Sequence, residues 1–303
     1  MLLNRALIRR ASAVVTLMLC AAGCARRASP ELWREVSGEH AFAHVRAMVA
    51  LGPRVPGSEP LEKCRSYIEG QLRACGWTVV RQTFTDDTPR GKTQFTNLFA
   101  RFGRDARPRF LLCSHYDTKI FDSLRFVGAN DGGSSTGLVI ELGRVLSIDP
   151  SLAKTIELVF FDGEEAVESF SDRDGLYGSR FFANDLKKNG AEKPFRGGMV
   201  FDMVGDRSLG ITLPVDSPPG MARDIFAAAD ALHQRDHFSY FTGGSILDDH
   251  SPLNEIGIPT IDLIDFDYPP WHTAEDTLDK ISPESLSIVG QVAIYYLTHF
   301  LPK

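Results

Sequence analysis

Residues 156–165 read Ile-Glu-Leu-Val-Phe-Phe-Asp-Gly-Glu-Glu, a short apolar run that leads directly into a glycine and a pair of carboxylates. Short apolar runs that alternate with helical stretches are typical of buried parallel strands joined by crossover helices. The sequence therefore predicts an α/β fold, a single domain with a mixed, centrally parallel sheet of about six to eight strands and helices on both faces. The other strand-like runs and helical stretches lie at 110–113, 135–146, 176–186, 198–204, 221–233 and 260–264.

The segments that precede this alternation carry local signals of their own. Apolar residues at three- and four-residue spacing predict an amphipathic helix over 61–75, with Ser58 as its cap. Two extended segments, 78–84 and 97–102, enclose a polar stretch with turn-rich residues at 86–91. This arrangement predicts a hairpin or an edge pair of strands.

Length and composition limit the possible functions. The chain has 303 residues, and 33 Lys and Arg against 39 Asp and Glu give a formal net charge of −6. An apolar share of 43% is that of ordinary globular proteins. Because no basic excess is present to neutralise phosphates, nucleic acid is not an expected partner. We expect one domain over residues 37–303, whose last helix begins after Ser282, where Pro283 follows the capping serine.

The first 24 residues have the features of an export signal. Three arginines precede an uncharged stretch over 11–23, which is too short to span roughly 30 Å of hydrocarbon. The segment resembles a bacterial lipoprotein signal, which implies a lipid anchor on Cys24, and plain secretion is the alternative. We expect an exported protein, periplasmic or at the cell surface, that meets the membrane only through this lipid and has a tether over 25–36.

Three cysteines lie outside the signal, namely Cys64, Cys75 and Cys113. Cys64 and Cys75 are eleven residues apart on one predicted helix. At about 1.5 Å per residue this separation is roughly 16 Å, which no disulfide bridges. We therefore expect no disulfide framework and interpret the three cysteines as small buried apolar side chains.

Side chains that can bind a metal gather just after the predicted strands. Open α/β sheets bind ligands beyond the carboxyl ends of their strands, so we expect these side chains to meet at that edge. The set combines imidazoles with carboxylates and contains no thiolate, which suits a hydrolytic zinc site with an open position and excludes a zinc finger. Its members are His115, Asp117, Asp131, Glu164, Glu165, Asp202 and His272.

Each of these residues also has an ordinary structural interpretation, because a single aspartate at the end of a strand usually caps a turn or a helix. The pair Glu164-Glu165 is harder to explain in that way. Phe160 and Phe161 run directly into it, and like charges beside a core need a counterion, which a divalent metal supplies. The pair therefore strengthens the metal interpretation of the whole set.

Seven short segments also carry a family resemblance, and they lie at 51–58, 111–119, 125–131, 160–166, 175–180, 248–250 and 271–273. Together they resemble the zinc peptidase clan that includes the family M28 aminopeptidases, and more closely the animal-type glutaminyl cyclases of that clan. The resemblance extends over nearly the whole chain from about residue 38 to residue 303.

By position, the resemblance implies a zinc held by Asp131, Glu165 and His272. It implies that Glu164 is the general acid and base of the reaction. Asp248 matches a carboxylate that lies near the reacting group in the cyclases, and it is the second expected catalytic residue.

Two further positions decide the expected number of metals. His115 and Asp202 bind a second zinc in the two-zinc aminopeptidases, where Asp131 bridges, whereas the cyclases keep such residues and work with one zinc. The resemblance thus implies one zinc per chain for a cyclase and two for an aminopeptidase. Trp271 is a cyclase feature expected to form a wall of the substrate pocket. Asp262, at a position where the animal cyclases carry a His, is expected in the same pocket.

The resemblance implies a zinc-dependent glutaminyl-peptide cyclotransferase, an acyltransferase that converts the N-terminal Gln of peptides or proteins to pyroglutamate and releases ammonia. Within the clan, the alternative is a two-zinc aminopeptidase that hydrolyses N-terminal residues. A catalytically inactive surface binding module is a remote third interpretation, because a decayed site is expected to lose ligands and none is missing here. The expected partners are peptides or proteins with an N-terminal Gln.

Overall fold

The computed structural model describes residues 31–301. The predicted signal and the first part of the predicted tether lie outside these described residues. The rest of the predicted tether packs on the domain, because the 3₁₀ helix η1 (Leu32–Glu35) contacts the last helix and Leu32 is only 2% exposed. The packed part of the chain therefore begins earlier than the predicted boundary at residue 37.

An eight-stranded mixed sheet forms the middle layer, in the order β1-β2-β4-β3-β5-β8-β6-β7. Its four central strands are parallel and buried, and they are β3 (Phe110–His115), β4 (Ile156–Phe161), β5 (Gly197–Asp202) and β8 (Thr260–Ile264). These strands are the apolar runs of the sequence, so the predicted parallel centre is confirmed. Burial on both faces explains why the runs are continuously apolar.

Antiparallel pairing closes both sides of this centre. On one side lies the hairpin of β1 (Trp77–Thr88) and β2 (Gly91–Phe102), with β2 antiparallel to β4. On the other side, β6 (Ile211–Leu213) pairs antiparallel with β8 and parallel with β7 (Phe238–Tyr240). The two short strands were not predicted, because three residues are too few to establish an alternating pattern.

The hairpin is longer than the sequence predicted. Residues 86–88, which we expected in a polar connection, continue β1 in register with β2. Asp87 lies opposite Lys92, with 3.7 Å between its carboxylate and the Lys92 ammonium, and the Thr88 hydroxyl donates to the Gly91 carbonyl. Cross-strand pairs of this kind support strand pairing between polar residues, so the true turn is only two residues long.

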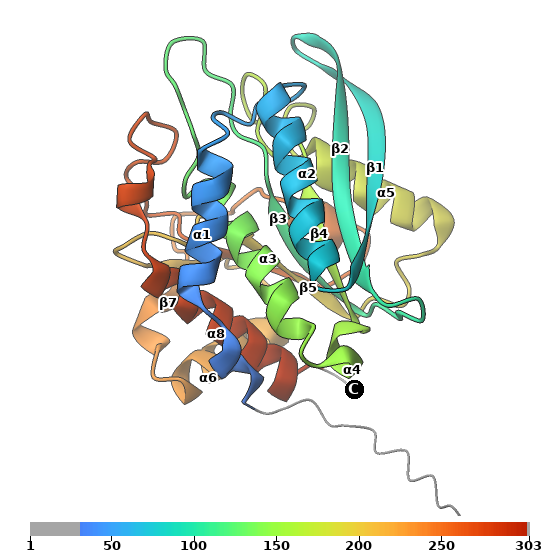
Figure 1. Cartoon of the computed structure of the whole chain (residues 1–303), viewed down its shortest axis with the longest axis vertical. Coiled ribbons are helices and arrows are strands. Elements are labelled where there is room, and N and C mark those ends of the chain that lie inside the picture. Colours follow the sequence, from blue (N-terminus) through green and yellow to red (C-terminus); the bar gives the residue numbers. More distant parts are fainter. Residues whose placement is uncertain (1–30, 302–303) are drawn as a thin grey trace, which may run out of the picture.

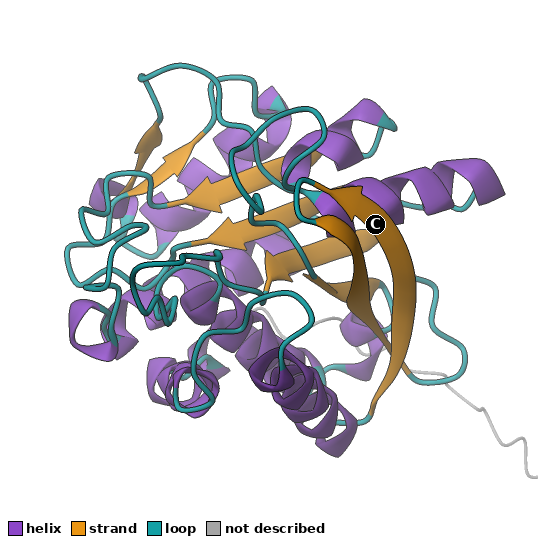
Figure 2. Cartoon of the chain, turned by 90° about the horizontal axis from the view of Figure 1, so that it is seen from above, coloured by secondary structure: helices purple, strands orange, loops and turns teal. Residues whose placement is uncertain are grey.

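Helices cover both faces of the sheet, as predicted (Figure 1 and Figure 2). The larger group comprises α1 (Gly38–Val49), α2 (Glu59–Ala74), α3 (Gly133–Leu146), α6 (Pro219–Ala231) and α8 (Pro283–His299), with the short α4 (Pro150–Ala153) after α3. The smaller group comprises α5 (Tyr177–Asn189) and α7 (His250–Glu255). Alternate strand residues serve the two cores: Leu112 packs under the larger group, and Leu111 under the smaller one.

The helix starts agree with their capping signals. The Ser58 hydroxyl accepts from the Leu61 backbone N–H at the start of α2, and the Ser282 hydroxyl accepts from the Ser285 N–H at the start of α8. Each bond satisfies a backbone donor that the helix itself leaves free. Both predicted caps are therefore confirmed.

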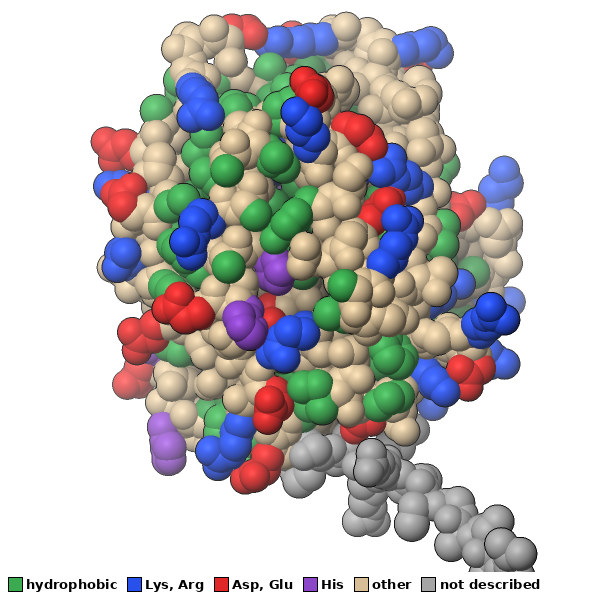
Figure 3. Space-filling model, in the orientation of Figure 1, with side chains coloured by type: hydrophobic (Ala, Val, Ile, Leu, Met, Phe, Trp, Pro, Cys, Tyr) green, Lys and Arg blue, Asp and Glu red, His purple; other side chains and the backbone are tan. Residues whose placement is uncertain are grey.

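The surface and the cysteines have the ordinary features of a globular protein. On the face shown in Figure 3, positive and negative side chains are mixed and no patch of one sign dominates. Cys64 and Cys113 are buried, Cys75 is half-buried, and all three are free. Within residues 31–301, no helix combines the length and the apolar character that a membrane span requires.

Candidate active site

The predicted metal-binding side chains converge at the carboxyl edge of the sheet. In Figure 2 the strand arrows point towards the loops at this edge. His115 is the last residue of β3 and Asp202 the last of β5. The remaining donors lie on loops: Asp131 precedes α3, and Glu165 follows β4. His272 lies on the loop after β8. Parallel strands thus bring together residues that are far apart in the sequence.

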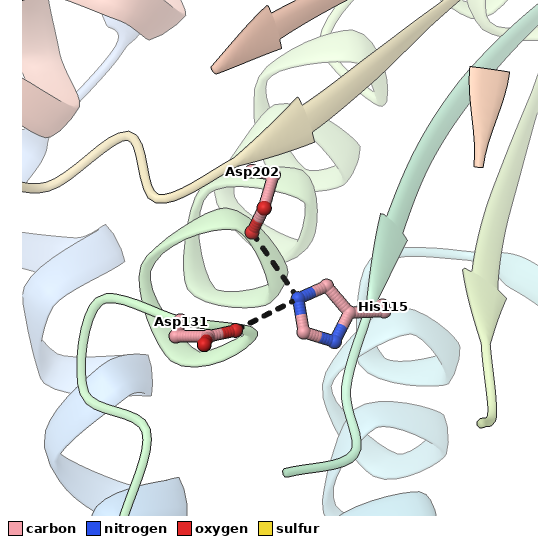
Figure 4. Close-up of side chains that lie close together, drawn as sticks. All are labelled: His115, Asp131 and Asp202. Atoms are coloured by element: carbon pink, nitrogen blue, oxygen red, sulfur yellow. Dashed lines mark hydrogen bonds and ion pairs between the residues drawn. The ribbon is translucent and has the colours of Figure 1, made fainter. Parts of the chain in front are cut away.

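Asp131 occupies the centre of this group. Its Oδ1 lies 3.3 Å from His115 Nε2, which is also 3.1 Å from Asp202 Oδ1 (Figure 4). Its Oδ2 lies 3.4 Å from His272 Nε2, which is 3.2 Å from Glu165 Oε1. One carboxylate is therefore shared by two sets of three donors, and within each set the donor atoms lie within 4.8 Å of one another.

The donor chemistry and the burial of these side chains fit a divalent cation. Asp131 and Glu165 are 2% and 3% exposed, yet Asp131 Oδ2 and Glu165 Oε2 accept no hydrogen bond from the described residues. A buried carboxylate oxygen without a donor is unfavourable unless a cation faces it. Imidazole nitrogen with carboxylate oxygen is the ligand combination of catalytic zinc sites.

Burial and mutual repulsion shift the ionisation of the site. Burial raises the pKa of Glu164 well above its usual range and that of Glu165 to about 7. Burial lowers the pKa of His272, but its close contacts with the carboxylates of Asp131 and Glu165 outweigh this effect and raise the pKa to about 9. Without a metal, these raised pKa values mean that protons on the carboxyl groups and on His272 offset the negative charge of the cluster. A bound cation would replace those protons.

Two carboxylates fix the backbone of the donor loops. Asp117 accepts from the backbone N–H groups of Glu164 and Glu165, at 3.2 and 3.4 Å. Asp276 accepts from the Asn130 and Asp131 N–H groups, at 2.8 and 3.1 Å. These bonds orient the metal donors through their own main chain rather than through their side chains.

Arg54 connects two donor loops by hydrogen bonds to their backbone carbonyls. Its side chain is fully buried, and it donates from Nε to the Tyr116 carbonyl at 2.9 Å. Its two terminal nitrogens donate to the carbonyls of Val127 and Gly128, at 2.7 and 2.9 Å. The acceptors lie beside His115 and just before Asp131, so one guanidinium fixes both loops. We call the segments 115–118 and 127–132, which these bonds hold, the floor.

Backbone conformation adds to this constraint at two positions. Gly132 has φ 71°, and a Cβ at this residue would lie 2.7 Å from the Asp117 carbonyl oxygen, so only glycine fits beside Asp131. His272 has φ 56°, in the left-handed region that non-glycine residues rarely adopt. Its imidazole stacks against Trp271 with ring centroids 4.3 Å apart, which holds the strained residue in place.

A cavity of about 230 Å³ opens over the donors. Glu164 and Asp248 line it together with Asp131, Glu165 and His272. Four large apolar side chains stand at its mouth, which we call the rim, and they are Phe170, Leu247, Phe266 and Trp271, between 37% and 51% exposed. Exposed apolar side chains grouped around a polar cavity are typical of a binding site.

Asp262 is not placed where we expected it. It is fully buried and does not line the cavity, because alternation along β8 turns its side chain towards α7 while Ile261 and Leu263 face the larger core. There its Oδ2 lies 3.5 Å from His250 Nδ1, and one donor atom each of Asp248, His250 and Asp262 lie within 4.8 Å of one another. Asp262 thus lies next to Asp248 but outside the cavity.

Sequence reasoning gave no role to several residues that shape the site. Arg54 lies in a segment that we quoted, but nothing in a single sequence distinguishes a buried arginine from an exposed one. Lys119 also has no sequence signal, although its Nζ lies 3.8 Å from Glu165 Oε2. Phe170, Leu247 and Phe266 of the rim lie on loops, whose conformations follow no periodic pattern.

The chain is similar to known enzymes that include both cyclotransferases and a peptidase. Peptidase family M28 matches residues 97–297. Over 283 residues the chain is 30% identical to a glutaminyl-peptide cyclotransferase of Bothrops jararaca, with 80% of this chain and 76% of the relative covered. A solved glutaminyl cyclase from an Acidobacteriales bacterium superposes with a TM-score of 0.79 at 31% identity, covering 96% of this chain and 98% of that one. A Zn-dependent exopeptidase from Parabacteroides distasonis superposes with a TM-score of 0.80 at 26% identity, covering 87% and 98%.

Proposed function

Because the chain belongs to peptidase family M28, we propose that it is a zinc-dependent glutaminyl-peptide cyclotransferase that forms pyroglutamate from N-terminal Gln. The observation that carries the proposal is the shared cavity: two carboxyl groups outside the primary donor set, Glu164 and Asp248, face the space over Asp131, Glu165 and His272. Similarity to the cyclotransferases selects this reaction among those that such a cavity supports.

One zinc per chain would be held by Asp131, Glu165 and His272. Asp131 and Glu165 each have a buried oxygen that accepts no hydrogen bond from the described residues, and this supports the assignment. When bound, zinc supplies a Lewis acid that polarises the γ-carboxamide oxygen of the substrate. His115 and Asp202 would act beside it, since the 3.1 Å contact between them and the 3.3 Å contact from His115 to Asp131 orient the shared carboxylate.

Glu164 carries the protons of the reaction. The α-amine nitrogen of the substrate attacks its own γ-carboxamide carbon, and the bond from that carbon to the amide nitrogen breaks. Glu164 takes a proton from the amine and returns it to the departing nitrogen, which leaves as ammonia. Burial raises the pKa of Glu164, which makes its carboxylate a stronger base towards the amine proton.

The pocket residues position the substrate for this step. Asp248 accepts a hydrogen bond from the departing amide, and Trp271 walls the pocket above His272. The nucleophile and its target belong to the same residue. The enzyme therefore has to hold the Gln side chain in the conformation that brings amine and carboxamide together, and no activated water is required.

An assay of two products tests the function. The purified domain is incubated with Gln-peptides and with aminoacyl-aminocoumarins, and both ammonia and fluorophore are measured. Ammonia without fluorophore is the expected result. Fluorophore release from residues other than Gln would favour hydrolysis, and absence of both products would favour an inactive binding module.

A two-zinc aminopeptidase is the second candidate, and the complete donor set His115, Asp131 and Asp202 favours it. Titration of zinc into the metal-free protein separates the two functions. Full ammonia release at one equivalent is expected for the cyclotransferase. Activity that arises only beyond one equivalent, with release of N-terminal residues, would support the peptidase. His115→Ala is expected to weaken turnover without halving the zinc content.

We also propose that the chain is exported by its first 24 residues to the periplasm or cell surface and anchored by a lipid on Cys24. The support is the sequence alone, an apolar stretch over 11–23 that ends in small residues before Cys24. Metabolic labelling with an alkyne fatty acid is expected to mark the wild type and Cys20→Ser but not Cys24→Ser. Labelling of Cys24→Ser, or none of the wild type, would contradict the anchor.

A further inference from the structure

A second cavity adjoins the mouth of the catalytic cavity. It measures about 280 Å³ and lies between α5 and α7. Leu247 lines both cavities and is 51% exposed, so it stands between them. The loop after β4 also borders both, because Phe170 lines the catalytic cavity and Asp172 lines the second one. The two cavities are thus neighbours along the same pair of loops.

The base of the second cavity is apolar and its edge is polar. Apart from Leu247, its apolar lining residues are Leu176, Ala183, Pro252 and Ile256. A concave apolar surface with a few polar groups at its edge is typical of a ligand site.

The charges at its edge leave two carboxylates free. Arg180 lines the cavity, but its Nη1 and Nη2 donate to the backbone carbonyls of Asp172 and Ser171, at 2.6 and 2.8 Å. The side chains of Asp172 and Glu255 are exposed and form no ion pair or hydrogen bond with any described residue. Two carboxylates against one guanidinium give the lining a net negative charge beside an apolar base, which complements the aliphatic stem and ammonium of a basic side chain.

We propose that the second cavity is a subsite for the peptide chain of the substrate. It selects a basic side chain at the third or fourth residue of the peptide, counted with the N-terminal Gln as the first. The proposal rests on the proposed function, which places the N-terminal Gln over the metal donors. An extended peptide advances by roughly 3.3–3.6 Å per residue, so its third and fourth residues lie roughly 7–11 Å beyond the first. Leu247 lines both cavities, so a peptide that leaves the catalytic cavity on this side meets the second one. Ser251 and Asn184 at the cavity edge have side chains with no partner among the described residues and are available to the peptide backbone.

Peptides of graded length and charge test the subsite. The short substrates are Gln-amide and Gln-Ala-amide. The longer ones are two series of tetrapeptide amides, Gln-Ala-Xaa-Ala and Gln-Ala-Ala-Xaa, in which Xaa is Lys, norleucine or Glu. Ammonia release gives kcat/KM at low and high salt. For at least one position, kcat/KM is expected to be about tenfold higher for Lys than for Glu, mainly through KM, and the ratio is expected to shrink at high salt.

A matched pair of variants assigns the effect to the second cavity. In Asp172→Asn/Glu255→Gln the ratio of Lys to Glu is expected to fall to about one. Asp230→Asn is the control, because Asp230 is an exposed carboxylate on α6, on the opposite face of the sheet, and it is expected to keep the ratio. Melting temperatures verify that all variants are folded.

The outcomes separate this inference from the proposed function. Turnover of Gln-amide without any dependence on peptide length or charge would overturn the subsite alone. An equal change in Asp230→Asn would also overturn it, since net charge and not the cavity would then set the preference. Absence of ammonia from every substrate would overturn the cyclotransferase and the subsite together.

Discussion

The floor and the rim of the catalytic cavity are built on different physical principles. The floor is buried, and Arg54 and Asp276 hold its backbone by hydrogen bonds between 2.7 and 3.1 Å. The rim consists of exposed apolar side chains, with aromatic contacts such as that between Phe266 and Trp271, whose ring centroids are 5.5 Å apart. A buried hydrogen-bond network fails when one member is lost, whereas an exposed side chain is replaced at little cost to stability. We therefore expect floor substitutions to affect zinc and chemistry, and rim substitutions to affect substrate affinity.

The largest effect is expected at the boundary between the two regions. His272→Ala removes a donor, so zinc and ammonia release should both be lost, as measured by atomic absorption and by the product assay. His40→Ala, which removes an exposed histidine on α1, is the control and should retain zinc. Stoichiometric zinc in His272→Ala would remove this residue from the donor set.

Glu164 tests chemistry separately from metal binding. Glu164→Gln keeps the shape of the side chain but cannot accept the amine proton, so kcat should fall by a factor on the order of 10² to 10⁴ with zinc content unchanged. Full turnover would exclude the proton-transfer role. Loss of zinc would instead mean that Glu164 and Glu165 have exchanged roles.

A pair of buried arginines tests whether the floor positions the metal. Arg54→Lys keeps the positive charge but cannot reach three carbonyls, so the zinc dissociation constant should rise about 10- to 100-fold in chelator competition. Arg65→Lys is the matched control, because Arg65 is also buried but donates to Asp162 and the Tyr116 hydroxyl instead of to floor carbonyls. Equal losses of zinc affinity in both variants would mean that general destabilisation, and not the floor, is responsible.

The smallest effect is expected at the rim. Phe266→Ala shortens the apolar wall of the mouth, so KM should rise by roughly three- to tenfold while kcat, zinc content and melting temperature stay near those of the wild type. The exposed Val80, on β1, provides a control substitution far from the mouth. A fall in kcat or in zinc content would break the distinction between floor and rim.

Much of the fold could be predicted because burial leaves a simple record in the sequence. The central strands are buried on both faces and therefore continuously apolar, as in 156–161 and 260–264. Helix starts at Ser58 and Ser282 carry local capping signals. The length of the hairpin could not be predicted, because residues 86–88 are polar and pair through their cross-strand neighbours.

The site shows the same division between local and non-local information. His115 and Asp202 end their strands, so topology alone brings them near Asp131. Asp262 was expected in the pocket because the animal cyclases carry a His at this position, but the alternation of β8 turns it towards α7. The role of Arg54 depends on carbonyls more than 60 residues away, at Tyr116, Val127 and Gly128, and no local pattern encodes such a contact.

The position of Asp131 between His115 and His272 has a thermodynamic consequence. Its two oxygens face different donor sets, so a cation in either set changes the charge and the orientation that the other set meets. Cations bound at the two sets would therefore be linked, and linkage requires that each occupant alter the affinity of the other by the same factor. The number of ions that the protein retains is then a property of the pair and depends on the free concentration of the metal.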